Sequence, residues 1–267
     1  MTAITADTLG TPRATVRPIP LMRVTQVELR KMFDTRSGFW LIASIGITAL
    51  LATAGVILFA PEADLTYSTF VSAIRFPMAV ILPIVAILSV TSEWTQRSGL
   101  TTFTLIPHRS RVITAKAISS VTVGVVSVLL AFVIGALGNV VGTAITGTDL
   151  VWNISLTQYL YFVLGNVLSL LIGFMLGVLI RASAGAIAGY FVYSFLLPTI
   201  FGLLAEGATW FRELQPWVDV QYAQSSLFLF EGALTGEQWA NIGVTAVIWL
   251  VIPLAIGLGF VTRAEVK

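Results

Sequence analysis

The sequence predicts an all-α membrane protein with six transmembrane helices, an N-terminal amphipathic surface helix, and both termini in the cytoplasm. Hydrophobic residues make up 57% of the 267 residues and charged residues only 10%, whereas a soluble domain carries about 25% charged residues. The mean hydropathy of the chain is +0.92. Six apolar runs contain most of the hydrophobic residues, and the ionisable residues gather in the connections between them.

Each membrane-spanning helix needs about 20 mostly apolar residues. The hydropathy pattern predicts such helices at residues 38–60, 77–94, 115–141, 158–180, 184–205 and 239–261. Thr235 and Gln238 form a capping box that indicates the start of the last helix. Glycines four residues apart recur along these spans, as Gly138/Gly142, Gly173/Gly177 and Gly185/Gly189. We expect these pairs to pack helices within the chain, with a dimer interface as the alternative.

Residues 1–20 lack an apolar core and a small-residue cleavage site, so they do not have the pattern of a secretory signal peptide. We expect them to form a disordered cytoplasmic tail. Residues 21–267 should form one membrane domain. Within it, residues 21–36 have the pattern of an amphipathic helix lying on the inner membrane surface. Glu28 lies at the edge of its apolar face, where a cationic partner is expected. The helix is either a simple membrane anchor or a brace for a partner subunit.

The basic residues predict the orientation. Thirteen of the 15 Lys and Arg residues lie in the N-terminal tail, the second and fourth connections, and the C-terminus. The other connections hold only Arg75 and Arg212, together with eight acidic residues. Because loops rich in Lys and Arg stay in the cytoplasm, both termini should face the cytoplasm. We expect the chain to lie in the inner or plasma membrane of the cell.

The second connection, residues 92–116, carries more apolar residues than an isolated loop should expose, among them Trp94, Leu100 and Phe103. Pro107 ends a short predicted helix, and arginines flank this break. We expect a partner protein to dock on this segment. The alternative is a loop that rests on anionic lipid headgroups.

The surface helix with its Glu-Leu-Arg-Lys run, residues 28–31, and the run Glu93, Arg97, Gly99, Leu100, Thr101, Leu105, Pro107, Arg109, Arg111 and Lys116 resemble the membrane subunit of a type-2 ABC transporter. The resemblance covers nearly the whole chain. It implies that the segment after the second span fits a cleft in a cytoplasmic ATP-binding subunit and that the surface helix packs beside this segment. The implied coupling residues are Glu28, Lys31, Glu93, Arg97, Gly99, Leu105, Pro107, Arg109 and Arg111.

The fifth connection, residues 206–240, is rich in Trp, Tyr and Phe, which suit the headgroup layer. The resemblance implies that this region folds into short helices that dip back into the outer leaflet. An ordinary aromatic belt is the alternative.

No catalytic site is predicted. Only Lys31, Lys116 and Lys267 occur and none follows a glycine, so a phosphate-binding loop is excluded, and ATP and Mg²⁺ should bind to the partner subunit. The chain has no cysteine and a single histidine, His108, which excludes disulfides and His-based metal sites. The basic pI of about 9.1 is explained by the Lys and Arg residues of the cytoplasmic connections, so we expect no nucleic-acid binding.

Polar residues within the spans are candidates for a substrate pathway, namely Asn166, Tyr190 and Tyr193. Hydrogen bonding between helices is the other interpretation. Arg75 precedes the second predicted span; it either reaches the outer headgroups or, if that helix begins near residue 68, contacts substrate or a gate.

The predicted function is that of a permease subunit, working as a homodimer or heterodimer in lipid with an ATP-binding subunit. Because no predicted span has a charge near its middle, we expect export of a lipophilic or amphipathic compound rather than a free ion. The alternative is a membrane scaffold or sensor that docks a cytoplasmic partner without transporting anything.

Overall fold

The computed structural model describes residues 19–34, 36–95, 109–230 and 232–263, and within these ranges every regular element is a helix. The helices are α1 (Leu21–Asp34), α2 (Arg36–Phe59), α3 (Tyr67–Thr95), α5 (Arg109–Thr146), α6 (Leu156–Ile180), α7 (Ser183–Phe191), α8 (Leu197–Gly207), α9 (Thr209–Val218), α10 (Val220–Ser225), α11 (Gly236–Ala246) and α12 (Ile252–Arg263). Two π-helical turns, Val192–Leu196 and Val247–Val251, join α7 to α8 and α11 to α12.

The predicted multi-pass membrane fold is confirmed. Six helices are long and apolar enough to span a bilayer: Gly38–Phe59, Tyr67–Ser92, Ser110–Thr146, Leu156–Ile180, Ser183–Gly207 and Gly236–Phe260. The helix of 38 residues, α5, is about 57 Å long at 1.5 Å per residue, compared with a hydrocarbon layer of about 30 Å. It therefore extends beyond the membrane at one or both ends.

The predicted start of the second span was wrong. The helix begins at Tyr67, ten residues before Pro77, which lies inside α3. The prediction failed because Ser and Thr residues and Arg75 lower the hydropathy of this first part of the helix. At the start of the helix, the Thr66 hydroxyl forms hydrogen bonds with the hydroxyls of Ser68 and Thr69. Arg75 consequently lies within a candidate membrane span, about 12 Å from the start of α3.

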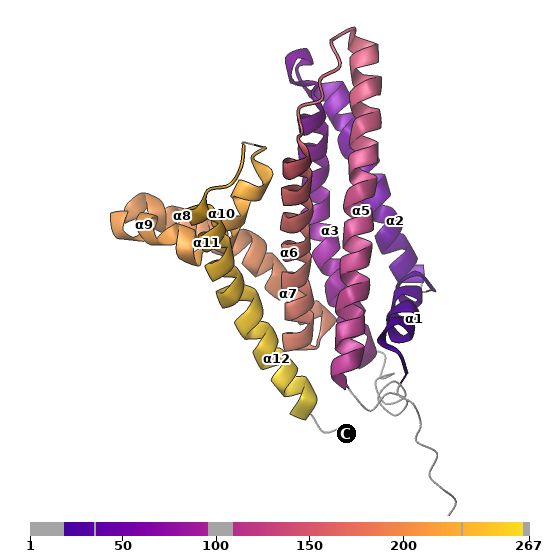
Figure 1. Ribbon diagram of the computed structural model, residues 1–267, viewed down its shortest axis with the longest axis vertical. Coiled ribbons are helices and arrows are strands. Elements are labelled where there is room, and N and C mark those ends of the chain that lie inside the picture. The colour runs from indigo at the N-terminus through magenta and orange to yellow at the C-terminus, as the bar shows by residue number, and fades with distance from the viewer. Residues whose placement is uncertain (1–18, 35, 96–108, 231, 264–267) are drawn as a thin grey trace, which may run out of the picture.

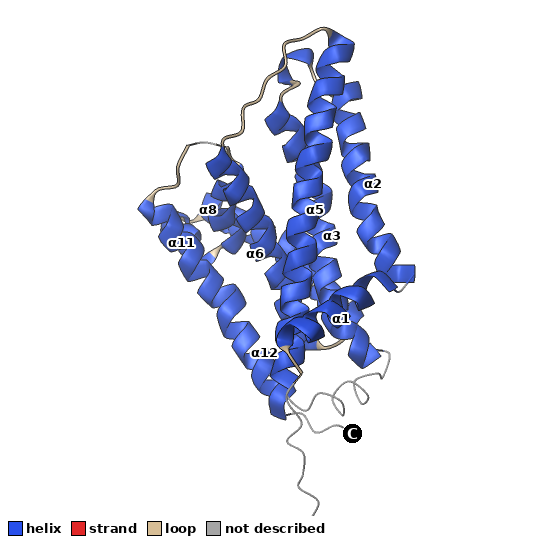
Figure 2. Cartoon of the chain, turned by 45° about the vertical axis from the view of Figure 1, so that its right-hand side comes forward, coloured by secondary structure: helices blue, strands red, loops and turns tan. Residues whose placement is uncertain are grey.

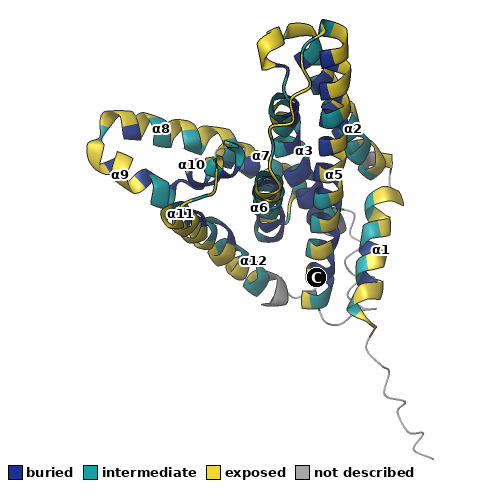
Figure 3. Cartoon of the chain, turned by 45° about the horizontal axis from the view of Figure 1, so that its top comes forward, coloured by how far each residue is buried: buried dark blue, intermediate teal, exposed yellow. Residues whose placement is uncertain are grey.

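Helices α2, α3, α5 and α6 form an upright bundle, and α8 to α11 lie to one side of it (Figure 1). Helix α1 crosses the base of this bundle, at the same end as the last turn of α12 (Figure 2). Exposed residues cover much of α2, α8, α9 and α11 (Figure 3). Because many of these residues are large and apolar, their surfaces suit lipid or a second protein rather than water.

The most extensive helix contact joins α3 and α6. A Cβ atom added at Gly173 would lie 2.5 Å from the Pro83 carbonyl oxygen, and one added at Gly177 would lie 3.2 Å from that of Ile87. The other glycine pairs also face residues of this chain, and Gly138 contacts Thr53 and Phe70. The interpretation that these pairs pack helices within the chain is therefore confirmed.

The region between residues 206 and 240 folds into short helices, as the resemblance implied. Helices α9 and α10 and a 3-10 turn, Ser226–Phe228, precede α11. Asp219 starts α10 by accepting hydrogen bonds from the backbone N–H groups of Gln221 and Tyr222. The predicted capping box of Thr235 and Gln238 starts α11, and a second box, which was not predicted, joins Ser155 and Gln158 at the start of α6.

Candidate functional site

Arg75 lines an internal cavity. Its side chain is half-buried, and the guanidinium carbon lies 3.8 Å from the centre of the Phe228 ring. Within the described part of the chain, this guanidinium forms no ion pair. The guanidinium is therefore held against the chain itself by a cation–π contact.

The cavity has a volume of about 120 Å³ and lies between α3, α6, the α7–α8 junction and α10. Its polar lining comes from Arg75, Asn166, Ser169, Tyr190, Ser194, Gln221 and Gln224. Its apolar lining includes Phe76 and Phe195, which are both exposed. No Asp or Glu lines it. Such a cavity offers hydrogen-bond donors and one positive charge within a mostly apolar bundle.

Three of the four predicted pathway residues line this cavity, namely Arg75, Asn166 and Tyr190, and the fourth, Tyr193, packs beside Tyr190. Tyr190 donates a hydrogen bond of 2.6 Å to the Ala79 carbonyl oxygen, which fixes the α7–α8 junction against α3. Asn166 donates to the Phe162 carbonyl oxygen at 2.8 Å. Tyr193 does not line the cavity; its ring packs 6.2 Å from that of Tyr190 and 5.8 Å from that of Trp249.

The π-helical turn of the fifth span positions Ser194 and Phe195 in the cavity wall. In this turn the N–H of Leu197 donates to the carbonyl oxygen of Val192, five residues earlier. The next residue, Pro198, has no N–H to donate and its ring crowds the carbonyl four residues before it, so a regular α-helix is unfavourable there. Pro253 follows the second π-helical turn in the same way.

The two π-helical turns contact each other. Tyr193 belongs to the first turn and Trp249 to the second, and their rings pack at 5.8 Å. The indole N–H of Trp249 donates to the Val218 carbonyl oxygen at the end of α9, at 2.8 Å. The fifth and sixth spans and the short helices are therefore linked beside the cavity.

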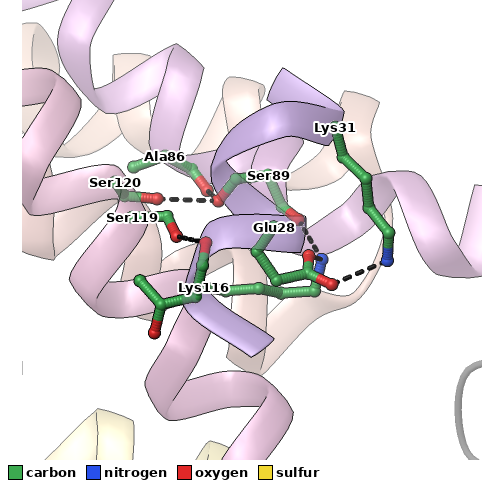
Figure 4. A network of polar contacts seen from close by, with 8 residues as sticks. Glu28, Lys31, Ala86, Ser89, Lys116, Ser119 and Ser120 are labelled. Carbon is green, nitrogen blue, oxygen red and sulfur yellow. Dashed lines mark hydrogen bonds and ion pairs between the residues drawn. The ribbon is translucent and has the colours of Figure 1, made fainter. Parts of the chain in front are cut away.

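A second polar cluster, at the far end of α3, attaches α1 to the bundle (Figure 4). The Glu28 carboxylate forms ion pairs with Lys116 of α5 and with Lys31, both at 2.6 Å. Lys116 also donates to the Ser89 carbonyl oxygen of α3 at 2.9 Å. Glu28 and Lys116 are each only 4% exposed. The predicted cationic partner of Glu28 is thus identified.

Burial by itself would raise the pKa of Glu28. The charge of Lys116 and the hydrogen bonds from Lys116 and Lys31 outweigh this effect and hold the pKa below its ordinary value. The carboxylate is therefore ionised at neutral pH, which its paired environment requires.

Further hydrogen bonds join α1 and the residues just before it to α5. The Ser119 hydroxyl donates to the Thr25 carbonyl oxygen at 3.0 Å, and Arg111 donates to the Ile19 carbonyl oxygen at 2.8 Å. The buried face of α1, with Val24 and Glu28, lies beside the predicted apolar face rather than at its centre. Met22 and Phe33 on that apolar face stay exposed, which leaves them for lipid or a partner.

Most of the predicted coupling residues cannot be placed in this cluster. Arg97, Gly99, Leu105 and Pro107 lie outside the described residues. Glu93 lies in the last turn of α3, and Arg109 is the first residue of α5. Their side chains are outside the described part of the chain. Glu28, Lys31 and Arg111 are placed, and all three form contacts within the chain.

Several residues of both clusters were not predicted. Gln221, Gln224 and Phe228 come from a turn-rich region whose packing against α6 leaves no pattern in the sequence. Lys116 was grouped with the basic loop residues, although it is the second residue of the span predicted at 115–141; in the structure that span begins at Ser110, which places Lys116 six residues inside it. Among the described residues, no group of Asp, Glu or His could hold a metal ion.

No family model matches the chain, and no curated protein matches it either.

Proposed function

We propose that this chain is the membrane-spanning subunit of a transporter for an amphipathic compound, driven by a separate ATP-binding subunit that docks at the connection between α3 and α5. One observation carries the proposal: α3 is a single continuous helix that joins the two polar clusters. Ser89, near its end, accepts a hydrogen bond from Lys116, and Arg75, about 20 Å away along the helix, lines the cavity.

The buried ion pair supplies the mechanical link in this proposal. Glu28 and Lys116 hold α1, α5 and α3 together where the docking segment begins and ends. A partner that pushes this segment moves three helices as one unit. Because α3 continues to the cavity, this movement changes the positions of Arg75 and Phe76 relative to α6 and α10.

The fifth and sixth spans are the second moving part. Each contains a π-helical turn before a proline, and such turns are frequent at functional sites and at kinks. Since the first turn carries Ser194 and Phe195, bending there opens or closes the cavity wall. A second copy of the chain, or a related subunit, would cover exposed apolar faces such as that of α8.

Transport is a better explanation of the cavity than scaffolding is. A scaffold has no use for a charged residue within its membrane span, where a charge costs at least about 2.5 kcal/mol. An ion-coupled carrier would place an acid or histidine in its pathway, and the residues that line the cavity include neither.

The proposal is tested by purifying the chain from its native membrane, identifying every bound subunit by mass spectrometry, and reconstituting the complex in liposomes. We expect a subunit with an ATP-binding loop and ATP turnover that a transported amphiphile stimulates. Charge reversal at Arg109 and Arg111 should uncouple turnover from transport without affecting insertion. The matched control is Arg36→Glu, because Arg36 is exposed and begins α2, next to α1. A regulator or kinase as the only bound partner would contradict the proposal.

A further inference from the structure

We propose that the cavity beside Arg75 binds the anionic oxygen group, a phosphate or carboxylate, of an amphipathic molecule whose apolar chain lies against Phe76 and Phe195. Both phenylalanines line the cavity, and they are 72% and 47% exposed, respectively. A charged head at Arg75 and an apolar tail on this exposed surface match the two parts of an amphiphile.

Arg75 has the geometry of an anion-binding residue. One face of its guanidinium lies over the Phe228 ring, at 3.8 Å. Stacking leaves the N–H groups at the edge of the plane available, and their fork geometry matches two oxygens of a phosphate or carboxylate. Within the described residues no carboxylate pairs with it.

Phe228 is held firmly enough to position the guanidinium. Its ring packs against Gly165 of α6 so closely that an added Cβ atom there would clash with it. The Phe162 ring meets it edge-on, with 5.5 Å between the ring centres. The arginine is therefore pre-oriented, which reduces the entropy that a ligand must overcome.

The cavity contains more hydrogen-bond donors than its own residues use. Gln224 is only 5% exposed, and its side chain forms no hydrogen bond within the described part of the chain. The buried Ser194 hydroxyl interacts with the Tyr190 hydroxyl but forms no hydrogen bond of ordinary geometry. Unsatisfied buried groups of this kind are costly and uncommon. An anion with several acceptor oxygens would satisfy them together with Arg75.

The buried acid on this side, Asp219, does not line the cavity, and within the described residues it forms no ion pair with Arg75. One of its carboxylate oxygens accepts the two N–H groups at the start of α10, and the other accepts from Gln215 at 3.1 Å. These bonds hold the carboxylate at the start of α10. The volume of about 120 Å³ suits a headgroup-sized fragment rather than a whole drug-sized molecule, which needs about 300 Å³ or more.

The ligand is either a lipid of the surrounding membrane or the transported compound. The second assignment rests on the transport function proposed above, whereas binding itself does not. We therefore test binding with the purified full chain in nanodiscs, without ATP or any partner, so that a failed result would refute the anion site and leave the transport proposal standing.

Calorimetric titrations of phosphatidylcholine nanodiscs with dodecyl phosphate, dodecanoate and dodecyltrimethylammonium would measure the affinity. We expect the two anions to bind and the cation not to bind above its partitioning into lipid. Arg75→Gln should weaken anion binding by about tenfold or more, and Arg75→Lys, which keeps the charge but loses the stacked fork, should be intermediate. Arg212→Gln, which removes a charge outside the cavity lining, should bind like the wild type.

Nanodiscs with added phosphatidylglycerol distinguish the two sources. If a membrane lipid fills the site, phosphatidylglycerol will stay bound to the wild-type chain during extraction and will block dodecyl phosphate. If a transported compound fills it, dodecyl phosphate will bind equally in both kinds of disc. Equal anion binding by the wild type and Arg75→Gln, or equal binding of the cation, would overturn the proposal.

Discussion

Removing Lys116 should detach α1 far more than removing Lys31, although both lysines pair with the same carboxylate at 2.6 Å. The changes Lys116→Met and Lys31→Met are chemically identical. They differ in environment, because the side chain of Lys116 is 4% exposed and that of Lys31 is 46% exposed. The comparison therefore measures the combined contribution of burial and of the extra hydrogen bond from Lys116 to the Ser89 carbonyl oxygen.

The expected magnitudes follow from this difference. Breaking a buried ion pair by removing one partner costs about 3–5 kcal/mol, because the other charge stays desolvated. Lys116→Met should fall at the low end, since Lys31 still holds one oxygen of Glu28. An exposed pair contributes about 0–1 kcal/mol. The local stability of α1 should thus fall on the order of a hundredfold in Lys116→Met and at most about fivefold in Lys31→Met.

Hydrogen–deuterium exchange of the chain in nanodiscs measures this local stability directly, because amides of α1 exchange when the helix detaches. Exchange should accelerate by these factors in α1 and stay unchanged in α6. The double variant Glu28→Gln/Lys116→Met should be less damaging than Lys116→Met alone, since it leaves no unpaired charge buried at this contact. Equal exchange in the two single lysine variants would show that the buried pair of Glu28 and Lys116 does not hold α1 in place.

The remaining predictions concern pH, helix packing and the π-helical turn. The pKa of Glu28 is lowered from its ordinary value of 4.5, so the ionised carboxylate stabilises the docked α1 helix above pH 4.5. Protection of α1 from exchange should be lost only as the pH falls below 4.5. The Glu28→Gln variant should not show this pH-dependent loss. Gly173→Ala should lower the thermal stability by about 1–3 kcal/mol through its clash with Pro83, whereas Gly202→Ala, with open space around it, should change it by less than about 0.5 kcal/mol; similar melting temperatures would contradict the packing described here. Pro198→Ala should restore a regular helix and turn position 194 out of the cavity, which a slower reaction of Ser194→Cys with a small hydrophilic thiol reagent would report in this cysteine-free chain.

The spans were predictable from sequence because the bilayer sets a strong local requirement. About 20 apolar residues must follow one another, and all six predicted runs are helices. The start of α3 was not predictable from hydropathy, since Arg75 argues against a membrane position unless its partner is known. That partner, Phe228, lies in a turn far along the chain.

The candidate sites were predictable only in part, for the same physical reason. The sequence shows that Glu28 interrupts an apolar face and so needs a cation, but the cation is Lys116, 88 residues away. Asn166 and Tyr190 were recognisable as polar groups inside apolar helices. Gln224 was not, because its burial depends on how the short helices after α8 pack against the bundle.

Transport by purified protein in liposomes shows whether the chain moves a compound only when a separate ATP-binding subunit drives it. Liposomes would hold either this chain alone or its complex with an ATP-binding subunit, and accumulation of a labelled amphipathic anion would be followed with ATP, with a proton gradient, and with neither. We expect uphill accumulation only for the complex with ATP. Uphill accumulation by the chain alone in a proton gradient would show that it is not driven by an ATP-binding subunit.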